Sequence, residues 1–328
     1  MRLFVYEYVS CQRGELPASL RREGAAMLVA LLEDAVRLNQ ATVCTMCAGD
    51  MHLPPGVNGH QNEGQEESVL FRQLSAEADV TLAIAPETGG LLRERRIWTE
   101  RAGGEWLGCS ARAIDLTTDK LQLSRWLHDA GVPTPPCWLF DNPPEGNGLV
   151  AFPIVHKPRD GAGSQATFLA RNPEELSVGL RQVRDEGWEG ESLLQSFVLG
   201  LSVSVAFLVG PRQIVALEPA EQCLSDDGRF HYRGWRLPLA SELAERARRL
   251  ALRAVQVVPG LLGYVGVDLV LGPAADGSDD RIIEINPRLT TSYAGLRERI
   301  KGNLLDQMLK VWRGELSALP GGHARPPR

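Results

Sequence analysis

Two apolar segments in the last third of the chain, GYVGVDLVL (263–271) and RIIEINPR (281–288), constrain its fold more than any other feature. Both have the β-branched composition of buried strands, and each carries one carboxylate among its apolar residues, Asp268 in the first and Glu284 in the second. An unpaired carboxylate is costly to bury, so ordinary charges at strand ends explain the pattern less well than a shared site. The pair predicts two core strands that present acidic side chains to one site.

The spacing within the second segment points to a divalent cation. Glu284 and Asn286 are two residues apart, so both side chains leave the same face of a strand. With Asp268 they offer two carboxylates and an amide oxygen, which suit Mg²⁺, or Mn²⁺ as an alternative, rather than zinc. Arg288 follows two residues later, where its guanidinium can bind a phosphate or carboxylate through two parallel hydrogen bonds.

A lysine followed by a glycine loop gives the second signal. Lys157 lies in an apolar strand that runs into a loop of small residues, Gly161, Ala162, Gly163 and Ser164. Backbone N–H groups of such a loop can approach phosphate oxygens, and the lysine adds a point charge. The same loop satisfies the dinucleotide pattern G-x-G-x-x-A, but we expect residues 166–170 to continue as a strand rather than a helix, which disfavours that interpretation. The chain contains no G-x-x-x-x-G-K-[ST] motif.

Two weaker candidates stand elsewhere in the chain. Lys120 is expected at the start of a helix, and Gln195, with the residues up to Val198, at the end of a strand where amide groups could read an adenine edge. Taken alone, Lys120 is explained as a solvated surface charge. A polar residue at a sheet margin explains Gln195 equally well.

Strands and helices alternate in the first third of the chain. We predict strands at residues 3–9, 41–47 and 79–85, and helices at 17–38, 66–78 and 87–101. Such alternation favours a parallel sheet covered by helices. The stretch 50–64 is rich in Pro, Gly and Asn and is expected to be a mobile surface loop.

Beyond residue 114 the pattern changes to one in which strands dominate. A helix capped by Thr118 is expected to end near Gly131, followed by strands at 152–158, 166–170, 193–198, 203–209, 213–218, 263–271 and 281–285 and helices at 173–186, 239–257 and 304–313. We expect a βα domain over 1–110, two α+β subdomains over 111–190 and 191–315, and a flexible tail over 316–328.

Composition excludes several classes of protein. The 328 residues include 35 Lys and Arg against 41 Asp and Glu, a formal net charge of −6, which argues against a strongly basic nucleic-acid binder. We find no apolar run of about 18 residues that could span a bilayer and no signal peptide. We therefore expect a cytoplasmic protein that acts on small molecules, without nucleic-acid or membrane partners. The oligomeric state stays open, a homodimer included.

The six cysteines are scattered, so a disulfide framework is not expected. Cys44 and Cys47 form a C-x-x-C pair that a redox or zinc site could use, but no second pair completes a zinc set. Their apolar surroundings favour small core residues.

Taken in order, these residues resemble the ATP-grasp superfamily from about residue 111 to 313, and the preceding βα region is similar to the pre-grasp domain of that family. The resemblance implies two α+β subdomains that grip ATP, preceded by a Rossmann-like domain. It implies that Lys120 and Lys157 bind ATP phosphates, that the loop at 161–164 closes over them, and that magnesium is held by Asp268, Glu284 and Asn286. Gln195, followed by Val198, would replace the glutamate that more often reads adenine. No glutamate follows Gly200 to bind the ribose.

A narrower resemblance is to the tyramine–glutamate ligase group, which forms an amide in methanofuran-type cofactor biosynthesis. It rests on Glu7-Tyr8, Ala85-Pro86-Glu87, Tyr232-Arg-Gly-Trp235 and the run from Asn286 to Tyr293. It implies a carboxylate–amine ligase that works through an acyl phosphate. Catalytic roles would fall to Arg288 and Lys157, and substrate contacts to Glu7, Glu87, Tyr232, Trp235 and Thr291.

Other functions remain open at this point. They are a ligase for another amino acid or a dipeptide, a carboxylase-type relative, a nucleotide-binding regulatory protein without turnover, and a dehydrogenase. Intact metal-ligand candidates argue against the regulatory protein, since a protein that only binds nucleotide need not keep the full set.

Overall fold

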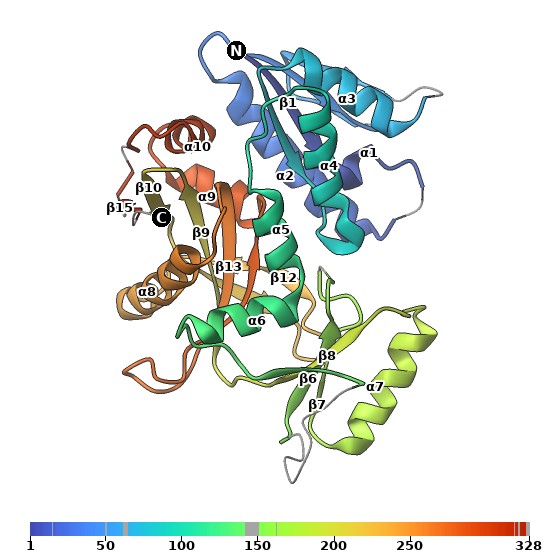
Figure 1. Ribbon diagram of the computed structural model, residues 1–328, viewed down its shortest axis with the longest axis vertical. Coiled ribbons are helices and arrows are strands. Elements are labelled where there is room, and N and C mark those ends of the chain that lie inside the picture. Colours follow the sequence, from blue (N-terminus) through green and yellow to red (C-terminus); the bar gives the residue numbers. More distant parts are fainter. Residues whose placement is uncertain are drawn as a thin grey trace.

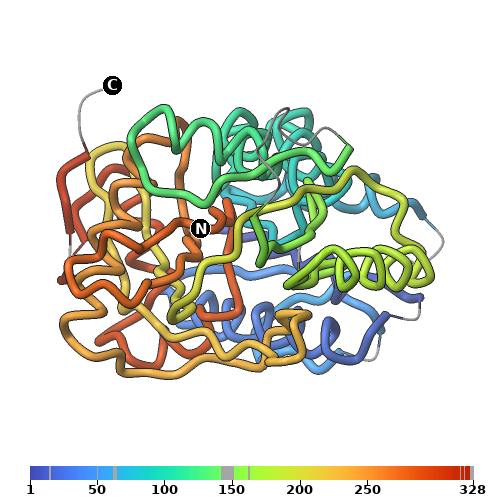
Figure 2. Tube along the Cα trace, turned by 90° about the horizontal axis from the view of Figure 1, so that it is seen from below, coloured from blue at the N-terminus to red at the C-terminus, as the bar shows by residue number. Residues whose placement is uncertain are grey.

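The computed structural model describes residues 1–14, 16–49, 51–61, 65–141, 151–161, 163–317, 319–320 and 322–325. Within these residues the chain forms one parallel and two antiparallel sheets, spread along the long axis of the molecule with helices against them (Figure 1). Figure 2 shows the helix at 173–185 at one end of the molecule and the orange and red C-terminal elements at the other. The mixed α/β and α+β class predicted from the sequence is confirmed.

The N-terminal sheet is parallel and has the strand order β3-β2-β1-β4. Its strands are β1 (Arg2–Glu7), β2 (Thr42–Met46), β3 (Val57–His60) and β4 (Val80–Ile84). Its helical elements are α1 (Tyr8–Cys11), α2 (Ala18–Val36), α3 (Glu67–Glu77), η1 (Thr88–Gly90) and α4 (Leu91–Arg101). From Leu3 onward every side chain of β1 is buried, as expected for a parallel sheet covered on both faces.

Two details of this sheet differ from the sequence prediction. The loop expected over 50–64 is wrong for residues 57–60, which pair with β2 as an edge strand. An edge strand needs a partner on one side only, so this pairing outweighs the weak strand propensity of Asn58 and Gly59. The first strand also ends early, at Glu7, because the carboxylate of Glu7 caps α1.

The cysteines of the C-x-x-C pair belong to this N-terminal unit. Cys44 lies in β2 and is half-buried, and burial raises the pKa of its thiol to about 11. Cys47 follows the strand and is buried.

The C-terminal sheet is antiparallel and is built around β9 (Leu201–Val209). β13 (Gly263–Leu271) pairs along the length of β9, and β14 (Arg281–Asn286) pairs with β13. Two strands share the other edge of β9, namely β10 (Gln213–Ala216) and β11 (Ala220–Leu224). β10 also pairs with β15 (Gly322–Ala324), and β11 also pairs with β12 (Tyr232–Arg236). The helices of this unit are α8 (Ser241–Val257), α9 (Ser292–Arg299) and α10 (Leu304–Trp312).

Both faces of β9 are buried. Val205 and Phe207 belong to the apolar cluster that includes α8, whereas Ala206 and Leu208 belong to the cluster that includes α10. Because side chains alternate along a strand, the two helices cover opposite faces of the sheet. This packing fixes β13 beside β9, and β13 in turn holds β14, which pairs with no other described strand.

The third sheet is small and antiparallel, with the order β5-β8-β6-β7. Its elements are β5 (Cys137–Leu139), β6 (Ile154–Pro158), β7 (Phe168–Ala170), β8 (Ser192–Ser196) and α7 (Pro173–Asp185), and it is reached through α5 (Ala111–Thr118) and α6 (Lys120–Asp129). A separate apolar cluster lies between this sheet and α7.

Several expectations for the second half are corrected. Thr118 ends α5 instead of capping a helix; Asp119 caps α6 by accepting hydrogen bonds from the N–H groups of Leu121 and Gln122. The tail expected to be flexible over 316–328 contains β15, which pairs with β10. β11, β12 and α9 are not predicted from the sequence. The boundaries at 110, 190 and 315 stay a prediction.

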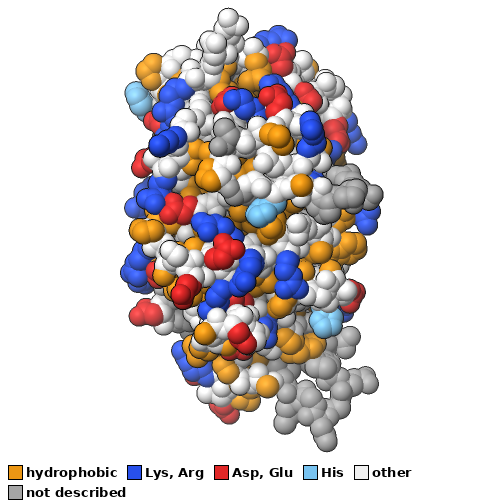
Figure 3. Space-filling model, turned by 90° about the vertical axis from the view of Figure 1, so that its left-hand side faces the viewer, with side chains coloured by type: hydrophobic (Ala, Val, Ile, Leu, Met, Phe, Trp, Pro, Cys, Tyr) orange, Lys and Arg blue, Asp and Glu red, His pale blue; other side chains and the backbone are white. Residues whose placement is uncertain are grey.

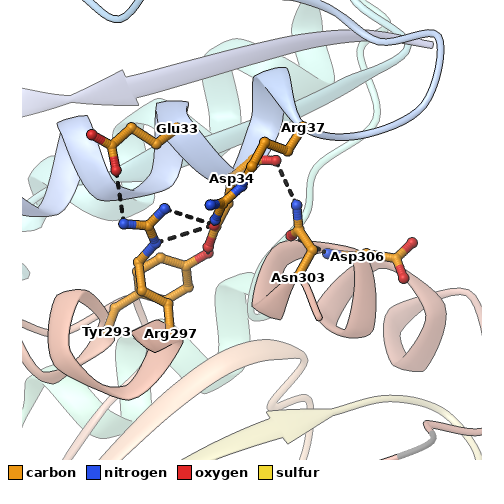
Figure 4. A network of polar contacts seen from close by, with 7 residues as sticks. All are labelled: Glu33, Asp34, Arg37, Tyr293, Arg297, Asn303 and Asp306. Atoms are coloured by element: carbon orange, nitrogen blue, oxygen red, sulfur yellow. Dashed lines mark hydrogen bonds and ion pairs between the residues drawn. The ribbon is translucent and has the colours of Figure 1, made fainter. Parts of the chain in front are cut away.

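A buried polar network joins the N-terminal unit to the C-terminal one (Figure 4). Asp34 of α2 is fully buried and accepts hydrogen bonds from the hydroxyl of Tyr293 at 2.6 Å and from Arg297 at 2.9 and 3.1 Å. Arg297 also donates to Glu33 at 2.8 Å, and the amide of Asn303 donates to the backbone carbonyl of Asp34 at 2.7 Å. We call these five residues the interdomain network; it holds α2 against α9 and the start of α10.

Charged side chains of both signs lie on the part of the surface that Figure 3 shows. On the face shown in Figure 3, Lys and Arg side chains are interspersed with Asp and Glu side chains. In the ranges that the structure describes, no helix is both long and apolar enough to cross a membrane.

Candidate active site

A cleft of about 670 Å³ lies where the three sheets approach one another. β6 and β8 of the small sheet form one wall, β11, β13 and β14 of the C-terminal sheet form another, and α2 with the residues after β4 closes the third side. The residues that the sequence singles out for phosphate, metal and substrate binding come from all three walls.

Asp268 and Glu284 are cross-strand partners on β13 and β14, so their side chains stand side by side on one face of the sheet. Asn286 lies on the same face of β14 and donates its amide Nδ2 to Oδ2 of Asp268 at 3.0 Å. Gln222 of β11 donates to the other oxygen of Asp268, also at 3.0 Å. The structure thus brings together the side chains that the sequence predicts as metal ligands.

The two carboxylates respond differently to their surroundings. Burial, reinforced by the neighbouring charge of Glu284, raises the pKa of Asp268 to about 7. Burial acts in the same direction on Glu284. The charges of Lys120, Lys157 and Arg288 outweigh it, however, and hold the pKa of Glu284 below its usual value. Glu284 is therefore ionised at neutral pH, while Asp268 carries a proton part of the time unless a cation neutralises the pair.

This donor set fits a hard divalent cation. Among the described residues, no group of three or more His, Cys, Asp and Glu side chains is placed to hold a metal ion. An ion at Asp268 and Glu284 would therefore depend on these two carboxylates, the amide oxygen of Asn286 and oxygens of a bound ligand. Mg²⁺ is commonly held in this way, by one or two carboxylates together with substrate phosphates.

Two lysines face the carboxylates across the cleft. Lys157 of β6 is buried, and its Nζ donates to Oε1 of Gln195 at 2.8 Å. Burial, reinforced by the nearby charge of Lys120, lowers the pKa of Lys157 to about 8. Lys120 begins α6, and its Nζ lies 3.6 Å from Oε2 of Glu284 and donates to the carbonyl of Gly161. Gln195 therefore positions Lys157, a contact that the sequence does not reveal.

The glycine loop borders the same space. The described residues of this loop, Gly161, Gly163 and Ser164, line the cleft, and so does Val198. Ala162, a further candidate for phosphate binding, lies outside the described residues. The backbone turns sharply here, with φ of +66° at Gly163 and +60° at Ser164, and the Ser164 hydroxyl donates to the carbonyl of Phe230 at 2.7 Å. A strand, β7, follows the loop as the sequence predicts, which is unlike a dinucleotide fingerprint.

Arg288 reaches the cleft from the segment after β14 and is held by the N-terminal unit. Its Nε lies 3.0 Å from Oε1 of Glu87, and its Nη2 donates to Oε2 of Glu87 at 3.1 Å. Both side chains are largely buried. Glu87, which the resemblance assigns to substrate, therefore has both oxygens engaged by the guanidinium.

Glu7 is likewise engaged by the protein. Its carboxylate accepts hydrogen bonds from the backbone N–H groups of Val9 at 3.0 Å and Ser10 at 2.7 Å, and from the Ser10 hydroxyl at 2.6 Å. Gly24 of α2 packs directly against it, since a Cβ at that position would lie 2.6 Å from Oε2 of Glu7. Glu7 lines the cleft, but it also serves as the cap of α1.

Aromatic and hydroxyl side chains border the outer part of the cleft. Tyr232 and Trp235 of β12 and Thr291, just before α9, all line it. Burial raises the pKa of Tyr232, and a hydrogen bond with Thr291 opposes the rise. The indole of Trp235 lies against Gly295, where a Cβ would approach the ring to 1.8 Å. The glycine of α9 thus makes room for the indole.

The sequence gives no prediction for three residues that line the cleft, Ser204, Gln222 and Glu23. Ser204 carries a recognisable signal, because it is a polar residue in the buried run of β9, and it hydrogen-bonds Asp268. Gln222 lies in β11, whose sequence AEQCL lacks a strand pattern. Glu23 lies in the second turn of α2 and carries no local signal.

Comparison with known proteins agrees with this geometry. The ATP-grasp domain family matches residues 117–292, and the pre ATP-grasp 3 domain family matches residues 43–114. The chain is 30% identical over 219 residues to tyramine–L-glutamate ligase of Methanocaldococcus fervens, covering 67% of this chain and 62% of that protein. It is 29% identical over 238 residues to tyramine–L-glutamate ligase of Methanocaldococcus jannaschii, covering 72% of this chain and 65% of that protein. The match thus spans less than two thirds of each relative.

The fold has close counterparts among solved structures. An ATP-grasp superfamily protein from Archaeoglobus fulgidus superposes with a TM-score of 0.71 at 24% identity, covering 97% of this chain and 89% of that one. The family match extends over more than half of the chain and contains both lysines and the Asp268–Glu284 pair. The chain therefore belongs to the ATP-grasp family.

Proposed function

We propose that the protein is an ATP-dependent carboxylate–amine ligase that joins glutamate to tyramine or a related phenolic amine, in a step of methanofuran-type cofactor biosynthesis. The observation that carries the proposal is the convergence of two carboxylates, two lysines and an arginine on one cleft, in a member of the ATP-grasp family. The similarity to two tyramine–L-glutamate ligases supports the choice of substrates.

The reaction proceeds in two steps. A substrate carboxylate attacks the γ-phosphorus of ATP, which forms an acyl phosphate and releases ADP. The neutral amine then attacks the acyl carbon, an amide forms, and phosphate leaves with loss of the proton from nitrogen. Bringing a carboxylate to a polyphosphate concentrates negative charge, so the site must supply positive charge where it develops.

The side chains of this cleft supply that charge. Lys120 and Lys157 bind the ATP phosphates, and Arg288, oriented by Glu87, binds the carboxylate and then the acyl phosphate. Magnesium held by Asp268 and Glu284, with Asn286, would neutralise the phosphate oxygens when bound.

Other parts of the cleft position ATP and exclude water. The loop at 161–164 covers the phosphates, which protects the acyl phosphate from hydrolysis. Gln195 holds Lys157 and, with Val198, borders the adenine pocket.

The proposal is tested by incubating the protein with ATP, Mg²⁺, glutamate and tyramine and analysing the products by mass spectrometry. We expect a product whose mass is the sum of glutamate and tyramine minus water, formed one for one with ADP and phosphate. The Glu284→Gln variant serves as a negative control.

A set of other amino acids and amines, run in parallel, separates ligases of different specificity. If an amide forms from a different amino acid and amine, the proposed ligase reaction stands, but glutamate and tyramine are not its substrates. No ADP release with any pair, in a protein that binds ATP normally, would contradict the ligase function.

A further inference from the structure

One face of α2 forms a wall of the cleft. Leu20, Glu23, Gly24 and Met27 are spaced three and four residues apart, so they lie on the same side of the helix, and all of them line the cleft. Further along α2, Leu28 and Leu31 belong with Met27 to a buried apolar cluster. The wall is apolar except for the single carboxylate of Glu23.

The carboxylates that line the cleft differ in their partners. There are four among the described residues: Glu7, Glu23, Asp268 and Glu284. Asp268 and Glu284 have the hydrogen bonds and the ion pair given above, and Glu7 caps α1. Within the described part of the chain, Glu23 has neither a hydrogen bond nor an ion pair. It is therefore the acidic group of the cleft that is left for a ligand.

Glu23 lines the same cleft as the aromatic residues Tyr232 and Trp235. Its side chain is half-buried, and burial raises its pKa, against which the charge of Arg22 acts. Burial raises the pKa of Tyr232, the hydrogen bond to Thr291 lowers it, and the negative charge of Glu23 raises it further. The carboxylate of α2 and the phenol of β12 both border this cleft.

The surroundings of Glu23 indicate which chemical group it can bind. Its carboxylate is partly shielded from water, and apolar and aromatic side chains line the same cleft. Partial desolvation of an anion is costly unless a cation pairs with it. Leu20, Met27 and Trp235 offer surface to the hydrocarbon part of a molecule. An organic ammonium group attached to a hydrocarbon body satisfies both requirements.

On the basis of the ligase function proposed above, we propose that Glu23 binds the ammonium group of a substrate. Both substrates of such a ligase can carry one: the acceptor amine, and the amino acid through its α-ammonium. Of the two carboxylates that the sequence associates with substrate, Glu7 accepts hydrogen bonds from α1, and Glu87 forms an ion pair with Arg288. Glu23 thus supplies the contact that they would otherwise provide.

The test compares wild type with Glu23→Gln, which keeps the shape of the side chain and removes its charge. Steady-state kinetics are measured with glutamate, tyramine and ATP varied in turn. We expect the KM for one ammonium-bearing substrate to rise about 10- to 100-fold, the range for loss of a charged hydrogen bond, while the KM for ATP stays unchanged. Glu77→Gln, the same change of charge on the exposed side of α3, is the matched control and should leave all three values unchanged.

Analogues without the ammonium group distinguish the two sources. Glutarate replaces glutamate as a substrate, and 4-ethylphenol replaces tyramine as a competitive ligand. If Glu23 holds the amino acid, wild type prefers glutamate to glutarate and the variant loses that preference. If it holds the amine, wild type binds tyramine more tightly than 4-ethylphenol and the variant does not.

Equal KM values for both substrates in Glu23→Gln and wild type would overturn this inference while leaving the ligase function intact. A rise in the KM for ATP as large as that for the substrates would also overturn it. If wild type forms no amide from any pair, the ligase function fails, and the assignment of Glu23 fails with it.

Discussion

Among the described residues, the interdomain network and the charged cluster of the cleft are both buried, but they differ in how completely their charges are paired. In the interdomain network, Asp34 receives hydrogen bonds from Tyr293 and Arg297, and all its neighbours are protein groups (Figure 4). In the cleft, Asp268 and Glu284 lie next to each other and line the cavity. Burial and the charge of Glu284 raise the pKa of Asp268 to about 7. A network closed on itself serves stability, whereas a cluster of unbalanced charges facing a cavity serves a ligand.

The largest effect is expected from removing a charge in the cleft. Glu284→Gln should lower the rate of amide formation by about 10³-fold, because the site loses one of two carboxylates that neutralise a divalent ion. Its free energy of unfolding should stay within about 1 kcal/mol of wild type, since Asp268 is relieved of a like-charged neighbour. Turnover assays and urea denaturation of the same preparation give both values. If Glu284→Gln lost several kcal/mol of stability, the cluster in the cleft would serve stability as the interdomain network does, and the contrast between them would be wrong.

The reverse result is expected for the interdomain network. Asp34→Asn should lower the free energy of unfolding by about 3 kcal/mol, because it removes the buried carboxylate that pairs with Arg297 and leaves only the more exposed Glu33. Below its unfolding temperature the variant should keep turnover within about tenfold of wild type. Urea denaturation measures the first quantity and product formation the second. A variant as stable as wild type would show that the network contributes nothing to stability.

Tyr293→Phe sharpens the comparison by removing one hydrogen bond and no charge. We expect a loss of about 1.5–3 kcal/mol in the free energy of unfolding, the usual value for a buried hydrogen bond to a charged group. The loss should be smaller in the double variant with Asp34→Asn than the sum of the two single effects, because the two residues share one contact. Full additivity would contradict a direct interaction.

The smallest effect concerns the pH dependence of nucleotide binding. Lys157 has a pKa lowered to about 8 by burial, so in the free protein Nζ loses its proton as the pH rises through that value. Bound phosphates favour the charged form, so the affinity for ADP should fall about tenfold between pH 7 and 9. Isothermal titration calorimetry measures the affinity. The fall should be reduced in Lys157→Met, and an equal fall in both proteins would assign the pH dependence to another group.

The sequence predicts the central part of the site well because its signals are local. A carboxylate inside an apolar strand, as at Asp268, is visible in nine consecutive residues, and two-residue spacing alone places Glu284 and Asn286 on one face. The same holds for the strands and helices with strong apolar periodicity, such as α8 and β9.

The contacts that the sequence does not reveal join distant parts of the chain. Glu87 and Arg288 are 201 residues apart, and Asp34 and Tyr293 are 259 apart, so no local pattern records either contact. Glu23 enters the cleft only because α2 is held against α9, an orientation set by packing between units. The strand β11 is held by its neighbours rather than by its own composition, which conceals Gln222.

The most direct test of the account is a crystal structure with a non-hydrolysable ATP analogue and Mn²⁺, whose anomalous scattering locates the ion. We predict manganese bound by Asp268, Glu284 and Asn286, between these side chains and the terminal phosphates of the analogue. Manganese at another position, or Asp268 and Glu284 turned away from the phosphates, would contradict the assignment of this cleft.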